Sequence, residues 1–557
     1  GLGDVYKRQI LAGAALAVMP SCNDFLDTLP TDAMTPSTTW QTELDAQKFL
    51  VGCYDGWESG TEILYMDCTS DFGYNNFSWE GYKDFANGTI SAANPGANFY
   101  DFTIIRRCNT FLENIEKVTF ADEKTKKDLI AQARVIRAYR YFKMNWLYGG
   151  VPIIENYESA VDAQVPKKTE DEVRTFIETE LDTYTYDLSV KPTERGRIAQ
   201  GAALAIRMRE ALYYGDWSTA KTKAQEIIDL QQYDLEKGKE GYSKLFQVAG
   251  QDSKEIILAV QYINSTKPLG VIGQMYNNGD GGWSSIVPTH QLVDAYEMTN
   301  GKTIDEEGSG YDKKHPFKGR DPRLALTVIY PGANYVKSDG STAVFNTLDK
   351  EIVNAKGEKA SNPNFMTAAD NASKTGLTWN KYLSPITQYT DIWNTNACPI
   401  VFRFAEVLLT WAEAENELNG PSTDVFDKID EVRTRTGMPA MDRQKYNTKD
   451  KLRELIHRER SVEFAGEGLR RADIVRWKDA SGKMVAETVL NGRLERRIGT
   501  VDMNGSNPET RATIKLDASA EEKLIEVRKF EPKHRYFPFA QSILDKNPNL
   551  IQVNGYE

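Results

Sequence analysis

Two segments of the chain combine aromatic rings with amide and glycine residues, a mixture suited to sugar binding. The first spans residues 71–82 and the second spans residues 275–283. Flat aromatic faces pack against the apolar C–H side of a sugar ring, while amides and carboxylates hydrogen-bond its hydroxyls. We therefore predict a ligand site formed by Tyr74, Asn75, Asn76, Phe77, Trp79, Tyr82, Tyr276, Asn277, Asn278, Asp280 and Trp283.

The same aromatic side chains have a second interpretation, in which they fasten their loops to the scaffold. The position of the residues favours ligand binding over this interpretation, because loops run over the surface and aromatic residues on them are poorly placed to form a core. If one ring face covers roughly 100 Å² of a sugar, burial at ~25 cal/mol per Å² contributes about 2.5 kcal/mol before ordering costs. Two or three such rings would give roughly millimolar to micromolar binding. Both interpretations stay open for each residue.

A run of interleaved charges raises the question of catalysis. Its members are Arg458, Glu459, Arg460, Glu463, Glu467, Arg470, Arg471, Asp473 and Arg476. Paired carboxylates can act as general acid and base, but opposite charges interleaved at helical spacing are typical of a salt-bridged face. We predict the structural role.

No recognisable catalytic or cofactor motif occurs in the sequence. It contains no GxSxG, no phosphate-binding GxxxxGK[ST] and no HExxH, and its histidines are far apart. We predict that the protein is not an enzyme, has no cofactor and uses its histidines at the surface or as helix caps: His290, His315, His457 and His534. Residues 545–549 lack the glycine and final acidic residue of a calcium loop. The sequence leaves a structural calcium ion elsewhere open.

The net charge limits the classes of macromolecule that the chain can bind, and the cysteine spacing limits its metal sites and disulfides. The 557-residue chain has a formal net charge of −12, which repels polyanions, so nucleic acid is excluded as a partner. Besides Cys22, the four cysteines form no CxxC and have no histidine nearby. We interpret Cys53, Cys68, Cys108 and Cys398 as packing residues, with a Cys53–Cys68 disulfide as the alternative.

The first 21 residues are interpreted as processing sequence and not as part of the fold. Residues 1–9 resemble a translated sequencing-library adaptor, and the apolar run 10–18 leading to Ser21 and Cys22 has the layout of a bacterial lipoprotein signal. That run is too short to span a bilayer. We predict that Cys22 is acylated and anchors the chain to a membrane. The alternative is an N-terminal core strand with Cys22 buried.

Segments with helical periodicity lie on both sides of a loop-rich middle region. Apolar spacing of 3 and 4 predicts a long helix over 129–146 and further helices elsewhere. We expect these at 42–57, 170–187, 198–214, 217–230, 404–418 and 452–464. Small residues around the turn at Tyr214–Trp217 resemble a tetratricopeptide repeat, in which helix pairs stack closely. We divide the chain at 1–21, 22–239, 240–400 and 401–557, and expect 22–557 to form one compact body whose insert, 240–400, is loop-rich.

A collinear set of motifs resembles the SusD/RagB family of outer-membrane nutrient-binding lipoproteins. The matching stretches are 22–27, 109–113, 133–142, 148–152, 320–323, 403–414, 432–437, 459–468, 476–477 and 547–556. The resemblance implies a mainly α fold, a tetratricopeptide-like scaffold with a loop-rich insert that forms the ligand-binding lobe. It also implies a lipid-anchored protein of the outer membrane at the cell surface, which captures an oligosaccharide and delivers it to a TonB-dependent transporter.

Other functions remain alternatives. Some relatives take peptides, and a helical glycoside hydrolase would need two carboxylates about 5–10 Å apart across a cleft. A pure tetratricopeptide scaffold protein explains neither the aromatic loops nor the lipid anchor. A third aromatic cluster, Trp379, Tyr389 and Trp393, ranks lower as a ligand site because Trp379 lies in a stretch that the family uses structurally.

Overall fold

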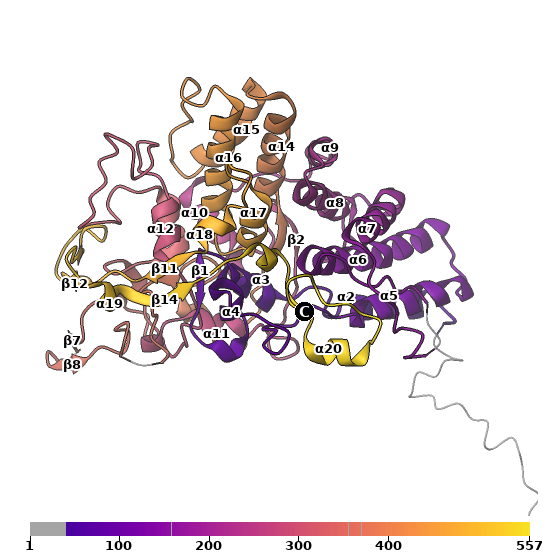
Figure 1. The fold of residues 1–557 in the computed structure, drawn as a ribbon, viewed down its shortest axis with the longest axis horizontal. Coiled ribbons are helices and arrows are strands. Elements are labelled where there is room, and N and C mark those ends of the chain that lie inside the picture. The colour runs from indigo at the N-terminus through magenta and orange to yellow at the C-terminus, as the bar shows by residue number, and fades with distance from the viewer. Residues whose placement is uncertain (1–39, 157–158, 355, 369) are drawn as a thin grey trace, which may run out of the picture.

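The computed structural model describes residues 40–156, 159–354, 356–368 and 370–557. The predictions for residues 1–21, for Cys22 as the lipidated residue and for the tether that follows it lie outside these ranges. Stacked helices form the right-hand part of the molecule in Figure 1, and loops with short strands form the left-hand part. The fold is mainly α, as predicted.

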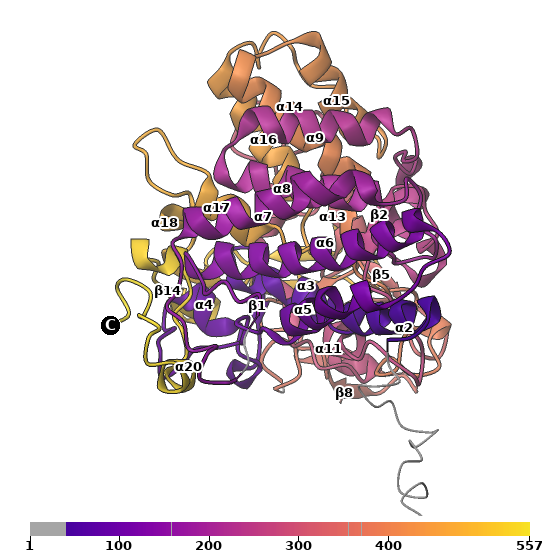
Figure 2. The same ribbon diagram turned by 90° about the vertical axis from the view of Figure 1, so that its right-hand side faces the viewer.

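Antiparallel helices stack side by side to form the scaffold, as Figure 2 shows. Its N-terminal helices are α2 (Glu43–Tyr54), α5 (Thr103–Asn114), α6 (Glu123–Tyr148), α7 (Glu170–Tyr184), α8 (Gln200–Tyr214) and α9 (Trp217–Asp229). Its C-terminal helices are α14 (Phe404–Asn419), α15 (Thr423–Thr434), α16 (Lys449–Glu463) and α17 (Arg470–Arg476). Each helix predicted from periodicity is present. α6 begins six residues before the predicted start, because its first turns are rich in lysine and carry no apolar signal.

Small residues allow the two halves of the scaffold to meet. Gly215 ends α8 in the left-handed conformation (φ 74°), and the Asp216 side chain accepts a hydrogen bond from the Thr219 N–H at 3.2 Å to begin α9. Ala211, Ala220 and Ala414 pack together in one buried cluster. The predicted close stacking is therefore confirmed, and it joins α14, from the C-terminal region, directly to α8 and α9.

Short helices and two-stranded sheets make up the insert. Its helices are α10 (Gly238–Leu245), α11 (Val271–Met275), α12 (His290–Ala295) and α13 (Pro322–Thr327). Its strands are β2 (Ile256–Ala259), β3 (Ile286–Pro288), β4 (Val328–Ile329), β5 (Asn334–Val336), β6 (Thr342–Val344), β7 (Glu351–Val353), β8 (Lys359–Ser361) and β9 (Thr378–Trp379). Antiparallel pairing of β2 with β10 (Ile400–Arg403), immediately before α14, ties the insert to the scaffold.

A strand near the N-terminus pairs with the insert, and the strands near the C-terminus pair with one another. β1 (Gly73–Asn75) pairs with β3, and β11 (Gly492–Glu495) pairs with β14 (Leu524–Arg528). β12 (Gly499–Val501) pairs with β13 (Ala512–Ile514), and the small helices α3 (Gly60–Met66), α4 (Lys83–Asn87), α18 (Ala486–Val489), α19 (Ala520–Lys523) and α20 (Gln541–Lys546) fill the remaining connections. We expected helices and coil throughout 401–557, so the strands between 492 and 528 are a difference. Each has only three to five residues, too few for period-2 patterning to show.

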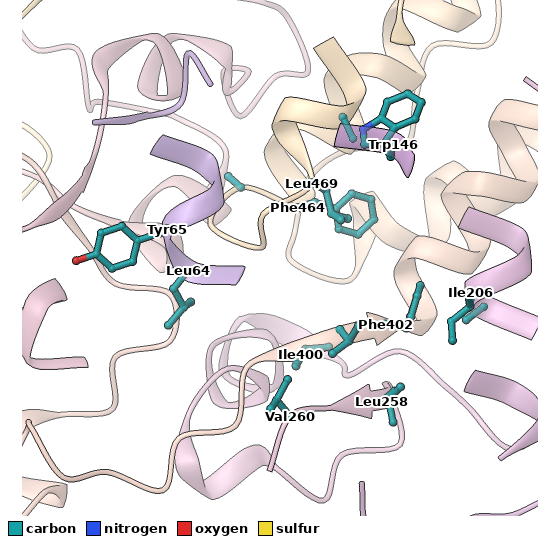
Figure 3. Close-up of a cluster of buried hydrophobic side chains, with 14 of the residues drawn as sticks. Leu64, Tyr65, Trp146, Ile206, Leu258, Val260, Ile400, Phe402, Phe464 and Leu469 are labelled. Carbon is teal, nitrogen blue, oxygen red and sulfur yellow. The ribbon is translucent and has the colours of Figure 1, made fainter. Parts of the chain in front are cut away.

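One continuous core lies between the scaffold and the insert. Figure 3 shows side chains from α6 (Trp146), α8 (Ile206), β2 (Leu258), β10 (Phe402) and the C-terminal helical region (Leu469) converging on it. All of these residues are buried. The core therefore fixes the insert relative to the helices.

Three of the interleaved charges, Glu459, Glu463 and Glu467, belong to a buried network that we call the ion-pair seam. Its members are Glu255, Glu297, Asp321, Arg323, Lys381, Arg403, Arg433, Arg435, Glu459, Glu463 and Glu467. Glu463 lies at its centre and contacts Arg323 at 2.9 Å and Arg403 at 2.8 Å. The predicted salt-bridged role is confirmed, but these pairs are buried and join α16 to the insert and to β10.

Two histidines are more buried than a surface role predicts, although one of them is a cap, the other predicted role. His290 and His534 are buried, and the pKa of His534 is lowered to about 4, chiefly by burial. His534 does cap the turn at Pro532–Arg535, accepting the Glu531 N–H at 2.9 Å, whereas His290 hydrogen-bonds the Thr375 carbonyl at 3.1 Å. Neither was recognisable as buried from its sequence neighbours.

The four cysteines of the described chain are buried, as predicted for packing residues. Each has a free thiol, so the alternative Cys53–Cys68 disulfide is not formed. Within the described ranges, no helix is both long enough and apolar enough to cross a membrane.

Candidate functional site

Strand pairing brings the two aromatic loops together. β1 and β3 are antiparallel, with Asn75 opposite Ile286, and the Asn76 N–H donates to the Ser285 carbonyl at 2.7 Å. In an antiparallel pair, residues that follow one strand and residues that precede the other lie at the same end. Trp79 and Trp283 occupy those positions, and their ring centroids are 6.3 Å apart.

Four aromatic side chains form a continuous group that we call the aromatic platform: Phe77, Trp79, Trp283 and Trp393. Phe77 lies 5.6 Å from Trp79, and Trp393 lies 4.9 Å from Trp283, measured between centroids. Trp79 is 68% exposed and Trp283 is 37% exposed. Large apolar groups exposed side by side mark an interaction site, because water contact with them is unfavourable.

A glycine allows Trp393 to join the platform. The indole of Trp393 lies against Gly273 so closely that a Cβ there would be 2.4 Å from the ring. The Gly273 carbonyl also accepts a hydrogen bond from the backbone N–H of Trp283 at 3.1 Å. One residue of α11 therefore positions two tryptophans.

Polar groups behind the platform fix the loop that carries Trp79. The carboxylate of Glu80 accepts hydrogen bonds from the Asn75 amide at 2.5 Å and from the Gln274 amide at 3.3 Å. Burial raises the pKa of Glu80 above its ordinary value, and the bond from Asn75 offsets part of that effect. Gly81 then takes a left-handed conformation (φ 88°), where a Cβ would lie 2.7 Å from the Ala97 nitrogen. The short turn Ser78–Glu80 is thus held at both ends.

The other predicted ligand residues have structural positions. Tyr74, Asn75, Tyr82, Tyr276, Asn277 and Asp280 are buried. Tyr82 packs against Tyr65 with centroids 4.7 Å apart, and the Tyr276 hydroxyl donates to the Ser384 carbonyl. These side chains fasten the loops from inside and do not reach the platform surface.

The side-chain amides of two predicted ligand residues, Asn76 and Asn278, bind a neighbouring loop. The Asn76 amide donates to the Asp370 carbonyl at 2.6 Å, and the Asn278 amide donates to the Pro363 carbonyl at 2.8 Å. Asp280 accepts from the Asn277 amide of its own turn at 2.9 Å and from the backbone N–H of Ser338, between β5 and β6, at 3.2 Å. The loop after β8 therefore braces both platform loops.

Trp393, from the third aromatic cluster, contacts the platform through Trp283. Its predicted companions lie elsewhere: Trp379 is buried in β9, and Tyr389 packs on Tyr276 with centroids 6.4 Å apart. Trp393 itself sits on a polar loop between Asp391 and Asn394, the same signal that identified Trp79 and Trp283. Grouping it with Trp379 by sequence proximity concealed that signal.

The arrangement is suited to contact with flat ligand faces and offers little acid–base chemistry. Glu463, in the charged run that raised the question of catalysis, is buried and surrounded by cations. Burial raises its pKa, but Arg435, Arg403 and Arg323 together lower it well below the ordinary range, so it stays ionised. Among the described residues, no group of three or more His, Cys, Asp or Glu side chains is placed to hold a metal ion.

Comparison with known families identifies the fold. The model of the SusD family matches residues 244–556, and a second model, described as starch-binding and associating with the outer membrane, matches residues 24–210. The chain belongs to the SusD family. The predicted family resemblance is confirmed, and the tetratricopeptide-like scaffold is the fold of the family.

Individual SusD-like proteins agree over most of their length. "SusD-like protein P25" of Formosa agariphila is 25% identical over 507 residues, covering 82% of this chain and 87% of that protein. A crystal structure of a SusD-like carbohydrate binding protein from Bacteroides fragilis is 26% identical with a TM-score of 0.78, covering 92% of this chain and all of the other. A surface glycan-binding protein A from Bacteroides uniformis shares the fold, with a TM-score of 0.63 at 20% identity.

Proposed function

We propose that the protein binds an oligosaccharide on the aromatic platform. The observation that carries this proposal is the meeting of Trp79 and Trp283, distant in sequence, as exposed adjacent rings. Aromatic faces stack on the apolar faces of sugars, and exposed tryptophans with no folding role need another explanation. Two similar proteins, the SusD-like carbohydrate binding protein of Bacteroides fragilis and the surface glycan-binding protein A of Bacteroides uniformis, support the same ligand class by their names.

We further propose that binding serves uptake. The outer-membrane description of the family model, together with the lipoprotein-like sequence ending at Cys22, supports a lipid-anchored position at the cell surface. A soluble body tethered there concentrates ligand but cannot move it across a membrane. We propose a TonB-dependent outer-membrane transporter as the partner that receives the sugar.

Capture takes place without cleavage. The rings of the platform are exposed, and the Glu80 carboxylate behind them is occupied by the Asn75 and Gln274 amides. A glycoside hydrolase needs two carboxyl groups facing the scissile bond at about 5–10 Å separation. We expect the bound oligosaccharide to be released unchanged.

Isothermal titration of the chain from Asn23 onward tests the ligand class. The panel contains neutral and charged oligosaccharides and peptides, and the variants are Trp79→Ala, Trp283→Ala and both together. Each lost ring face should weaken binding at least about tenfold, and the double variant should fall below detection. Chromatography of the ligand after prolonged incubation should show no shorter products.

Tyr186→Ala is the matched control, because Tyr186 is also an exposed aromatic residue (56%) but lies in the scaffold after α7. It should bind as the wild type does. Saturable binding of a peptide in place of a sugar would replace the proposed ligand class with the peptide alternative. Oligosaccharide binding that keeps its wild-type affinity in the double variant would place the site elsewhere.

A further inference from the structure

A crevice lies beside the close packing of α14 on α8 and α9, and its lining residues are not those of the aromatic platform. It has a volume of about 530 Å³ and lies between the ends of α6 and α8 on one side and α14, α16 and α17 on the other. Ligand-binding pockets in proteins typically measure about 300–1,000 Å³ and occur preferentially between structural units. Trp146 and Tyr213 also line a smaller adjoining cavity of about 100 Å³.

Tryptophan and tyrosine side chains line this crevice together with a larger number of charged ones. The tryptophans and tyrosines are Trp146, Tyr213, Tyr214, Trp217 and Trp477. Two of these are already covered, because Arg535 stacks 3.6 Å from the centroid of Trp146 and His457 stacks 3.9 Å from that of Trp477. Trp217 differs: it is half-buried against the alanine cluster of α8, α9 and α14, and no other described ring or cation stacks on it. It offers a ring face to a ligand.

Unused hydrogen-bonding groups accompany that ring. The hydroxyl of Tyr213 and the indole N–H of Trp217 make no hydrogen bond to the described part of the chain, although both residues are half-buried. By contrast, the Tyr214 hydroxyl accepts from the Asn145 amide at 2.9 Å, and the Trp477 indole donates to Glu413 at 3.1 Å. A hydroxylated ligand would satisfy the two unused groups.

The charges that line the crevice cancel locally. Glu413 pairs with Arg476 at 2.7 Å, Glu417 pairs with Arg453 at 2.7 Å through its second oxygen, and Glu170 lies 3.9 Å from Arg535. An ionic ligand placed at these three pairs would have to break one of them. Lys478 and Asp479, of opposite charge, also line the crevice and make no ion pair with the described residues. Paired ions still present oxygen lone pairs and N–H groups at their edges, which hydroxyl groups can use.

We propose that this crevice is a second saccharide site, which takes one or two residues of a neutral sugar against Trp217 and the Tyr213 hydroxyl. This site is separate from the aromatic platform, and the proposal for it does not depend on the function proposed for the platform. The platform contacts an extended ligand at the surface, whereas the crevice encloses a short one.

The indole N–H resonances of the tryptophans in a ¹H–¹⁵N spectrum of the chain from Asn23 test this site. The probes are glucose, galactose, mannose, xylose, maltose, lactose and cellobiose, with glucuronate and glucosamine as charged comparators. They are added to about 50 mM, since a single stacked ring gives millimolar affinity. Trp217→Phe assigns its resonance. We expect at least one neutral sugar to shift the Trp217 resonance saturably, and to shift it equally in the Trp79→Ala/Trp283→Ala double variant.

Tyr213→Phe supplies the specificity test, because it removes one hydroxyl and keeps the ring. Affinity at the Trp217 resonance should fall about fivefold, the effect of one neutral hydrogen bond. The proposal is overturned if no neutral sugar moves the resonance, if only the charged comparators move it, or if Tyr213→Phe binds as the wild type does. Shifts of Trp79 and Trp283 with an unmoved Trp217 would leave the platform function standing and remove the crevice site alone.

Discussion

The ion-pair seam and the aromatic platform put opposite kinds of side chain in unusual places. At the seam, charged groups are buried: Arg323 and Glu463 are each 0% exposed. At the platform, apolar rings face water, and Trp79 is 68% exposed. Both placements are unfavourable for an isolated side chain. Buried charges are tolerated because each has partners, whereas rings that stay exposed even though they contact one another imply a partner outside the chain.

The two regions also differ in how freely their residues can be substituted. Seam residues contact one another across α16, β10 and the insert, so changing one leaves others unpaired. Platform residues project from loops braced from behind by Asn75 and Glu80, so a ring can change without disturbing that bracing. Relatives of about 25% identity can therefore share the fold and bind different ligands.

Removing the central seam carboxylate should give the largest effect. Glu463→Gln leaves Arg323, Arg403 and Arg435 with one counter-charge fewer in a buried site, so the free energy of unfolding should fall by about 3–5 kcal/mol. Urea denaturation measures it. Glu351→Gln, at an exposed pair with Lys359, should change stability by less than about 0.5 kcal/mol. Equal losses in both variants would contradict the special role of the seam.

Asp67 lies where the two regions meet, directly before the platform loop, and accepts the Gly466 N–H next to Glu467. Burial raises its pKa to about 7 from an ordinary 3.8, so the folded state holds a proton that the unfolded state has released. Its contribution to stability is therefore complete below pH 3.8 and declines as the pH rises to 7.

Asp67→Asn should remove that decline. The free energy of unfolding of the variant should exceed that of the wild type by about 4 kcal/mol at pH 8 and should be nearly the same near pH 4. Urea titrations across this range compare the two proteins. A difference that does not depend on pH would mean that Asp67 does not take up a proton on folding in this range.

Gly273→Ala should disturb the platform and spare the seam. A Cβ placed 2.4 Å from the Trp393 indole must displace that ring and, through it, Trp283, so oligosaccharide affinity should fall about tenfold, or about 1.4 kcal/mol. Gly52→Ala, in α2 with nothing within 4 Å, should leave binding unchanged and stabilise the helix slightly. Binding titrations of both variants decide whether Trp393 belongs to the platform.

The sequence predicted the helices better than it predicted the contacts between them. Periodicity and small residues sufficed for α8, α9 and α14 because those signals are local. Seam partners could not be predicted, since Arg403 and Glu255 are 148 residues apart and any of many acidic residues could have paired with that arginine. For the platform, composition singled out the two loops and their exposed tryptophans. It could not distinguish Trp79 from the buried Tyr82, because the direction of a side chain depends on strand pairing with a distant segment.

One measurement tests the division between the two regions most directly: urea unfolding with and without a saturating amount of the oligosaccharide that binds most tightly. A ligand at 100 times its dissociation constant raises the free energy of unfolding by about 2.7 kcal/mol. We predict this increase in the wild type and in Glu463→Gln alike, and none in the Trp79→Ala/Trp283→Ala double variant. An increase that persists without the two tryptophans, or one that disappears with Glu463→Gln, would contradict the account.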